Sequence, residues 1–203
     1  MIKNLIFDFG GVLIDWNPLH LYNTYFQGDE AKAKWFIDNI CTMEWNTQMD
    51  AGKTFDEGVS ELTALHPDWA DAIAAYRDRW GEMIGGPIPG MLELVHQLKA
   101  LGYRLFGLSN WNWDTLSTII GDYPVMDELE GKIISGIEHV IKPHPEIFRL
   151  LLDRYHLNAD ESLFIDDNAT NVLGAEAVGI HGLQFSDAEK LKEDLCHLGI
   201  MES

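Results

Sequence analysis

Near its start the chain reads Leu5-Ile6-Phe7-Asp8-Phe9-Gly10-Gly11, a short apolar run that leads into a carboxylate and two glycines. Such a run is typical of a buried strand that enters a turn. The pattern occurs twice more, because residues 103–108 end at Ser109-Asn110 and residues 163–165 end at Asp166-Asp167. Polar side chains therefore follow directly after three predicted strands.

Helical patterns separate these predicted strands. Apolar residues recur at helical spacing over residues 92–101, 147–155 and 172–178, and Gly102 and Gly179 follow two of these stretches as stop signals. Strands that alternate with helices predict a doubly wound α/β fold with a parallel sheet. In such folds ligands bind outside the carboxyl ends of the strands, which is where the polar clusters fall.

The region from residue 16 to residue 87 has a different character. It contains no convincing strand, and its many aromatic and apolar residues suit packed helices. Turn-forming residues at 85–90, which read Gly-Gly-Pro-Ile-Pro-Gly, then mark a boundary. The sequence thus predicts a core domain of residues 1–15 and 88–203, with a helical domain of residues 16–87 inserted after the first strand.

The composition limits the classes of ligand. The formal net charge is −19, from 14 Lys and Arg against 33 Asp and Glu, so we expect neither nucleic acid nor a membrane surface as a partner. A small anionic substrate binds only where a local cation overrides this field. The chain lacks a signal-peptide pattern and any apolar run of the ~20 residues that span a bilayer. With Cys41 and Cys196 as free thiols, we expect a cytoplasmic protein.

The polar clusters suit phosphoryl transfer, which needs a nucleophile, a cation and hydrogen-bond donors aimed at the phosphate oxygens. Mg²⁺ prefers oxygen ligands and keeps several waters. Asp8 and Asp167 can supply two carboxylates, and the backbone carbonyl of Gly10 can supply a third ligand. The sequence therefore predicts a magnesium site beside Asp8.

Three further residues can complete such a site. Ser109 and Asn110 can donate hydrogen bonds to phosphate oxygens, and Lys142 can pair with the phosphate and help to keep Asp8 ionised. Each feature alone has an ordinary explanation, since Ser-Asn often caps a helix and a single lysine is often a solvated surface charge. The joint order of the clusters along the chain favours the phosphoryl-transfer site.

These clusters resemble the motifs of one known family. Residues 8–15 resemble the first motif of the haloacid dehalogenase superfamily, Ser109-Asn110 the second, Lys142-Pro143 the third and residues 166–171 the fourth. The motifs stand in the family's order and span nearly the whole chain, and a helical insertion after the first motif is typical of members with a type 1 cap. The resemblance implies a Rossmann-like core with a helical cap that opens for substrate and closes over it.

The resemblance also implies a role for each motif residue. Asp8 attacks phosphorus and forms an aspartyl-phosphate, while Asp167 ligates Mg²⁺ directly and Asp166 ligates it through water or supports the ligand shell. The remaining roles, which are phosphate binding, charge stabilisation and loop orientation, fall to Gly10, Ser109, Asn110, Lys142 and Asn171.

One position departs from the family pattern. Most phosphatases of the superfamily carry Asp two residues after the nucleophile, where it protonates the leaving alcohol, and this chain has Gly10. A positioned general acid is worth ~10²–10⁴-fold in rate. A bacterial subfamily that hydrolyses glucose 1-phosphate resembles this chain, with Gly at that position, and an anomeric oxygen leaves more easily than an ordinary alkoxide. We therefore favour a magnesium-dependent phosphatase that acts on a small phosphorylated metabolite, most simply a sugar phosphate.

Two alternatives stay open at this point. In a metal-independent 2-haloacid dehalogenase Asp8 would attack carbon, and halide would leave without a proton. Dehalogenases of the family usually replace the first acidic residue of the fourth motif, whereas this chain keeps both Asp166 and Asp167, which are costly side by side without a cation. The other alternative is a module that binds a phosphorylated ligand with little turnover, which measurable hydrolysis would exclude.

Tryptophans near the motifs have two interpretations. Trp111 and Trp113 follow the second motif, and Trp16 lies where the chain enters the helical region. Their faces suit stacking on a sugar ring, but the same side chains also suit packing between helices.

Overall fold

The structure is a computed structural model that describes residues 1–202. Within them a five-stranded parallel sheet forms the centre, in the order β5-β4-β1-β6-β7. The strands are β1 (Asn4–Phe7), β4 (Arg104–Ser109), β5 (Gly131–Ile134), β6 (Ser162–Asp166) and β7 (His181–Gln184). This sheet is the α/β core that the sequence predicts, and β1 lies in its middle.

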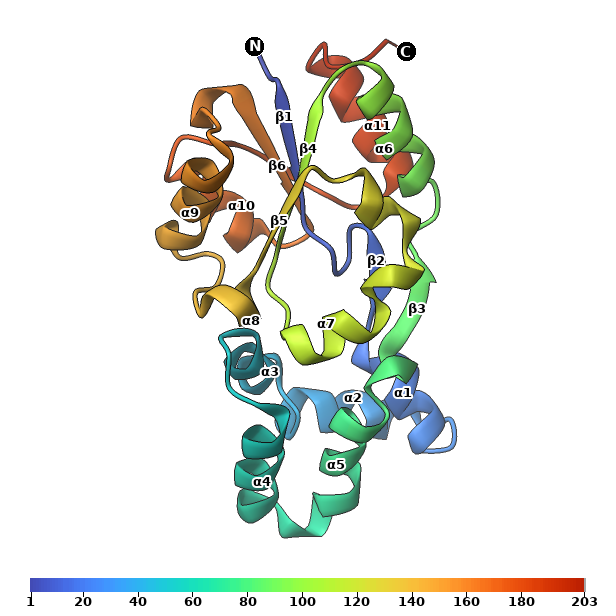
Figure 1. Ribbon diagram of the computed structural model, residues 1–203. Coiled ribbons are helices and arrows are strands. Elements are labelled where there is room, and N and C mark those ends of the chain that lie inside the picture. The colour runs from blue at the N-terminus through green and yellow to red at the C-terminus, as the bar shows by residue number, and fades with distance from the viewer. Residues whose placement is uncertain (203) are drawn as a thin grey trace.

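Helices cover both faces of the sheet (Figure 1). One face carries α9 (Pro145–Tyr155) and α10 (Ala169–Glu176), and the other carries α6 (Met91–Ala100) and α11 (Ala188–His197). Strand β1 is buried along its whole length, with Ile6 in the apolar cluster that includes α9 and its two neighbours in the cluster that includes α6 and α11. The alternation follows the two-residue period of a strand.

The register of the sheet places the polar residues that follow β1, β4 and β6 at the same edge of the sheet. Phe7 lies opposite Gly107 of β4 and opposite Ile165 of β6. Asp8, the next residue, therefore stands at the same height as Asp166, at the carboxyl edge of the sheet. Two short helices, α7 (Trp113–Ile119) and α8 (Ser135–Glu138), follow β4 and β5 at this edge.

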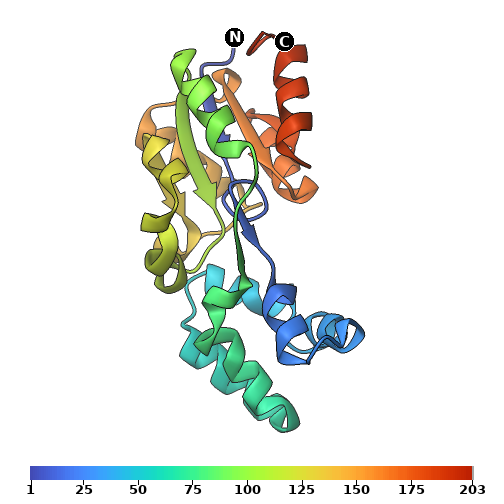
Figure 2. The same ribbon diagram turned by 90° about the vertical axis from the view of Figure 1, so that its right-hand side faces the viewer.

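A two-stranded antiparallel pair, β2 (Ile14–Trp16) and β3 (Ile84–Pro87), leads out of the core and back into it. Between them lie α1 (Pro18–Tyr25), α2 (Glu30–Asn39), α3 (Met43–Asp50), α4 (Phe55–Leu65) and α5 (Ala70–Asp78). Figures 1 and 2 show these helices gathered beyond the carboxyl ends of the sheet strands. The expectation of no strand in this region was wrong for β3, because its Ile-Gly-Gly-Pro sequence has little strand propensity and pairing with β2 forms it.

The helical region has an aromatic core of its own. The rings of Tyr22 in α1 and Phe36 in α2 have centroids 4.7 Å apart, and Trp45 in α3 meets Tyr76 in α5 edge to face at 5.0 Å. All four side chains are buried. This packing fixes α3 against its neighbours, which matters below because α3 forms one wall of the site. None of the helices within residues 1–202 has the length and hydrophobicity that a bilayer crossing demands.

Candidate active site

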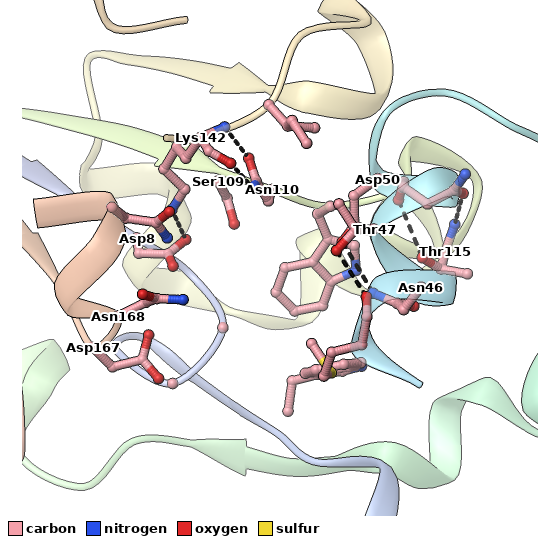
Figure 3. Close-up of a pocket in the computed structure, with 18 of the residues that line it drawn as sticks. Asp8, Asn46, Thr47, Asp50, Ser109, Asn110, Thr115, Lys142, Asp167 and Asn168 are labelled. Atoms are coloured by element: carbon pink, nitrogen blue, oxygen red, sulfur yellow. Dashed lines mark hydrogen bonds and ion pairs between the residues drawn. The ribbon is translucent and has the colours of Figure 1, made fainter. Parts of the chain in front are cut away.

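One cavity of about 500 Å³ lies between the carboxyl edge of the sheet and the helical region. Seven of the eight predicted site residues line it, and they are Asp8, Gly10, Ser109, Asn110, Lys142, Asp167 and Asn171. The eighth, Asp166, is fully buried directly behind this wall. The structure therefore gathers the four sequence motifs at a single place (Figure 3).

Lys142 holds the centre of this site. Its side chain is fully buried, and its Nζ lies 2.9 Å from Asp8 Oδ1 and 2.7 Å from Asp166 Oδ2. The same Nζ donates to the backbone carbonyl of Leu108 at 3.0 Å. An ammonium group has three N–H donors, so these contacts use all of them. Lys142 thus contacts two carboxylates but balances the charge of only one, and in this arrangement its N–H groups face protein acceptors.

The side chain of Asn110 positions this lysine. Its Oδ1 accepts from the backbone N–H of Lys142 at 2.8 Å, and its Nδ2 donates to the backbone carbonyl of Lys142 at 3.0 Å. These contacts use one of the two N–H groups of the Asn110 amide. The expected donation from Asn110 to a phosphate oxygen therefore stays a prediction, beside the role of Asn110 in positioning Lys142.

Ser109 is placed as a ligand-binding hydroxyl should be. Its side chain is buried at the cavity wall, and its Oγ makes no well-aligned hydrogen bond within residues 1–202, although its nearness opposes the rise in the pKa of Asp8. A buried hydroxyl without a partner carries a free-energy cost that a bound polar ligand would remove. This orphaned group fits the predicted contact with a phosphate oxygen.

The two aspartates of the fourth motif have different surroundings. Asp166 accepts from Lys142, from the backbone N–H of Asn168 at 2.8 Å, and from Asn171 Nδ2 at 3.2 and 3.1 Å. These partners hold it as a support behind the cavity. Asp167 is exposed and lines the cavity beside Asp8 (Figure 3). Asn171, which we expected to orient this loop, does so by holding Asp166.

The charges at this site do not balance. Asp8, Asp166 and Asp167 each offer one oxygen atom, and these atoms lie within 4.8 Å of one another. Burial raises the pKa of Asp8 to about 7, although Lys142 opposes the shift, and burial together with Asp166 also raises the pKa of Asp167. Three clustered carboxylates against one ammonium group favour a further cation, and an all-oxygen donor set is what Mg²⁺ prefers. The residues present therefore fit a magnesium ion.

Gly10 and Gly11 differ in whether the structure could accept a side chain in place of their hydrogen. Gly11 has a φ of +78°, and a Cβ there would lie 2.6 Å from Asp167 Oδ2, so the turn requires glycine. A Cβ at Gly10 would lie 3.6 Å from Trp111 and 3.9 Å from Trp16, which are ordinary contact distances. The backbone thus has room for a Cβ at position 10, so neither the backbone angle nor crowding requires glycine there.

The opposite wall of the cavity comes from α3, which the sequence analysis did not identify. Asn46, Thr47 and Asp50 line it, and Figure 3 shows them across the cavity from Asp8 and Asp167. Burial raises the pKa of Asp50 to about 7, opposed by the N–H of Asn112 and by Lys142. The available signal was the four-residue spacing of two polar residues on the buried side of a helix, which is common without any function.

The tryptophans considered above differ in whether they line the cavity. Trp16 and Trp111 line the cavity together with Trp80, whereas Trp113 is exposed and lies outside the lining. Stacking on a ligand is thus open to Trp16 and Trp111 but not to Trp113 in this arrangement.

Replacing Lys142 with Met should destabilise the fold, because it leaves two buried carboxylates without their counter-charge. We expect a loss of about 3–5 kcal/mol in the free energy of unfolding, measured by urea denaturation at pH 8 in a chelating buffer. Lys34→Met is the matched control, since Lys34 pairs with Asp38 at 2.8 Å on the surface and should change stability by at most about 1 kcal/mol. Equal losses in the two variants would contradict the central position of Lys142.

Comparison with known proteins places these motifs in a family. The family model of haloacid dehalogenase-like hydrolases matches residues 2–179. The sesquiterpene phosphatase astK of Aspergillus oryzae is 27% identical over 92% of this chain and 91% of its own length. The D-ribitol-5-phosphate phosphatase of Bacteroides thetaiotaomicron is 23% identical over 96% of this chain and 97% of its own length.

Solved structures of similar fold include enzymes of two kinds. A haloacid dehalogenase family enzyme from Bacteroides thetaiotaomicron, solved as a magnesium complex, has a TM-score of 0.66 and 25% identity over 98% of both chains. The L-2-haloacid dehalogenase of Xanthobacter autotrophicus, solved with chloropropionic acid covalently bound, has a TM-score of 0.64 and 18% identity over 99% of this chain and 85% of that one. Since the family model covers most of the chain and the fold agrees with it, this chain belongs to the haloacid dehalogenase-like hydrolases.

Proposed function

We propose that this chain is a magnesium-dependent phosphatase that hydrolyses a small phosphorylated metabolite, most simply a sugar phosphate, through an aspartyl-phosphate on Asp8. The observation that carries the proposal is the cavity wall itself. There Asp8 belongs to a group of carboxylates whose charge Lys142 does not balance, and the hydroxyl of Ser109 lines the same cavity without a well-aligned partner. Such a wall suits a phosphate group that binds together with a magnesium ion.

The geometry of Asp8 suits a nucleophile. Its Oδ1 accepts from the backbone N–H of Phe9 at 2.7 Å and from Lys142 at 2.9 Å, so the carboxylate is fixed in orientation. Its Oδ2 can then attack phosphorus, and the bond from phosphorus to the ester oxygen breaks. Water next attacks the phosphorus of the aspartyl-phosphate, which releases phosphate and restores Asp8.

Asp8, Asp167 and, behind them, Asp166 would hold the magnesium ion, which supplies positive charge against the phosphate oxygens when bound. Ser109 would donate to one of those oxygens. Lys142 would keep Asp8 ionised by its ion pair, and Asn110 would keep Lys142 in place. The backbone carbonyl of Gly10 would be the further magnesium ligand that the sequence predicts, and Asn171 would hold Asp166 in place.

The helical region would act as the cap of the site. We propose the domain boundaries expected from the sequence, with residues 1–15 and 88–203 as the core and residues 16–87 as the cap. The β2–β3 pair is the connection between them, and α3 closes the cavity over Asp8. A closed cap would exclude bulk water during the transfer of the phosphoryl group.

The relatives support phosphatase chemistry over dehalogenation. Two phosphatases match nearly the full length of the chain, and a similar structure was solved with magnesium. A dehalogenase of the same fold is a competing precedent, and halide departure would likewise need no acid at Gly10. The close approach of three carboxylates favours the phosphatase, because their repulsion needs a cation that dehalogenation does not use.

Phosphate release from a panel of esters that includes glucose 1-phosphate tests the proposal directly. We expect release with Mg²⁺ and none with a chelator, and a loss of roughly 10³-fold or more in Asp8→Asn, since covalent catalysis needs that carboxylate. Asp38→Asn, on the exposed side of α2, is the matched control and should keep wild-type activity. If folded protein releases no phosphate from any ester, the proposal fails; halide release in chelator would then establish a dehalogenase, and ester binding without turnover a binding module.

The identity of residue 10 should control how the rate depends on the leaving group. For the wild type we expect kcat/KM to fall steeply as the leaving group becomes more basic, because Gly10 cannot protonate it. Gly10→Asp has room for its Cβ and should raise the rate on alkyl phosphates relative to aryl phosphates at least about tenfold, within the range of a general acid. Gly10→Asn, similar in size but unable to transfer a proton, should keep the steep dependence. A flat dependence in the wild type would show that another group supplies the proton.

A further inference from the structure

We propose that Asp50 and Asn46 form a second polar subsite, which binds neutral hydroxyl groups at the end of the substrate away from the phosphate and disfavours a second anionic group there. The inference rests on the proposed phosphatase function, because it takes the phosphate to sit beside Asp8. The proposed subsite would let the enzyme select among phosphate esters, and the residues that make this selection lie on α3.

The position of these two residues suits the far end of a substrate. Both line the same cavity as Asp8, and Figure 3 shows them on the opposite side of it. A cavity of about 500 Å³ is far larger than a phosphate group requires and lies in the range of sites for small metabolites. Phe55 and Trp80 also line the cavity, and their rings suit the apolar faces of a ligand ring.

A chain of hydrogen bonds orients the subsite. The buried hydroxyl of Tyr76 donates to Asn46 Oδ1 at 2.9 Å, and Asn46 Nδ2 donates to Asp50 Oδ2 at 3.0 Å. The Asn46 amide therefore has one N–H left. The Asp50 carboxylate, whose two oxygens offer about four acceptor positions, keeps some beyond those that Asn46 and the N–H of Asn112 occupy. One donor beside one strong acceptor is the combination that a hydroxyl group, itself donor and acceptor, can satisfy.

Contacts with the core hold this subsite at a fixed place relative to Asp8. Ser135 Oγ donates to the backbone carbonyl of Asp50 at 2.7 Å, and Asn112 Nδ2 donates to the backbone carbonyl of Met49 at 3.2 Å. Asn112 follows the second motif by two residues, so the loop that begins after Ser109 also anchors the end of α3. The distance between the two polar ends of the cavity is thus set by direct bonds between α3 and the core.

The charges of the cavity argue against a second anion. Among its lining residues that the structure describes, the titratable side chains are Asp8, Asp50, Lys142 and Asp167. The one cation, Lys142, is already bound to Asp8 and Asp166. A carboxylate or second phosphate at the far end of a substrate would face Asp50 without a counter-charge, which costs binding free energy.

The test compares two esters that differ only in charge at the far end, glucose 1-phosphate and glucuronic acid 1-phosphate. Each is measured as a competitive inhibitor of p-nitrophenyl phosphate hydrolysis with Mg²⁺ at pH 8, where Asp50, with its pKa near 7, is ionised. For the wild type we expect the neutral sugar ester to bind at least tenfold more tightly. Asp50→Asn should bring the two inhibition constants within about twofold of each other, Asp50→Glu should keep the preference, and the exposed Asp38→Asn should keep the wild-type ratio.

The outcomes separate this inference from the proposed function. Equal inhibition constants in the wild type, or a preference that Asp50→Asn leaves unchanged, would overturn the subsite while the phosphatase stands. An absence of p-nitrophenyl phosphate hydrolysis by folded wild-type protein would instead overturn the phosphatase. The melting temperature of Asp50→Asn shows whether this variant folds. If it does not fold, the ratio of the two inhibition constants in the wild type still decides whether the far end disfavours an anion.

Discussion

The site depends on one buried ammonium group that bridges two carboxylates. Lys142 lies within 2.9 Å of Asp8 and 2.7 Å of Asp166, and the sheet register puts these two aspartates at the same height on neighbouring strands. Buried carboxylates at this separation would not both ionise without a counter-charge. The lysine makes the arrangement possible, but its single charge cannot balance the three clustered carboxylates, which favours a further cation at this site.

Gly10, which the fold does not require, affects the chemistry of the site because it leaves no acid at this position. Gly11 is dictated by its backbone angle and by the nearness of Asp167, whereas Gly10 has room for a Cβ. A phosphatase that lacks an acid at this position is confined to esters whose oxygen leaves easily. The polar residues of α3 would in addition disfavour esters that carry a second negative charge. Gly10 and α3 would therefore limit the substrates in two separate ways, the first by the leaving group and the second by charge.

Much of this arrangement is predictable from the sequence because it depends on short-range patterns. Apolar runs that end in Asp8, Ser109 and Asp166 predict parallel strands, and parallel strands bring their carboxyl ends to one edge. The pairing of the Asn110 amide with the Lys142 backbone is not predictable in this way, because it joins residues from separate loops. Asp50 has only a weak sequence signal, its four-residue spacing from Asn46, because its place in the cavity follows from how α3 docks against the core. Strand β3 forms through its partner β2, against its own composition.

The central claim is that Asp8 carries the phosphoryl group during turnover. Acid quenching of the enzyme during steady hydrolysis of its best ester, followed by mass analysis of its peptides, tests this claim most directly. We predict a phosphoryl mass on the peptide that contains Asp8, present during turnover and absent once the substrate is exhausted. Turnover that leaves no phosphoryl group on Asp8, or that places one on a different residue, would contradict the account.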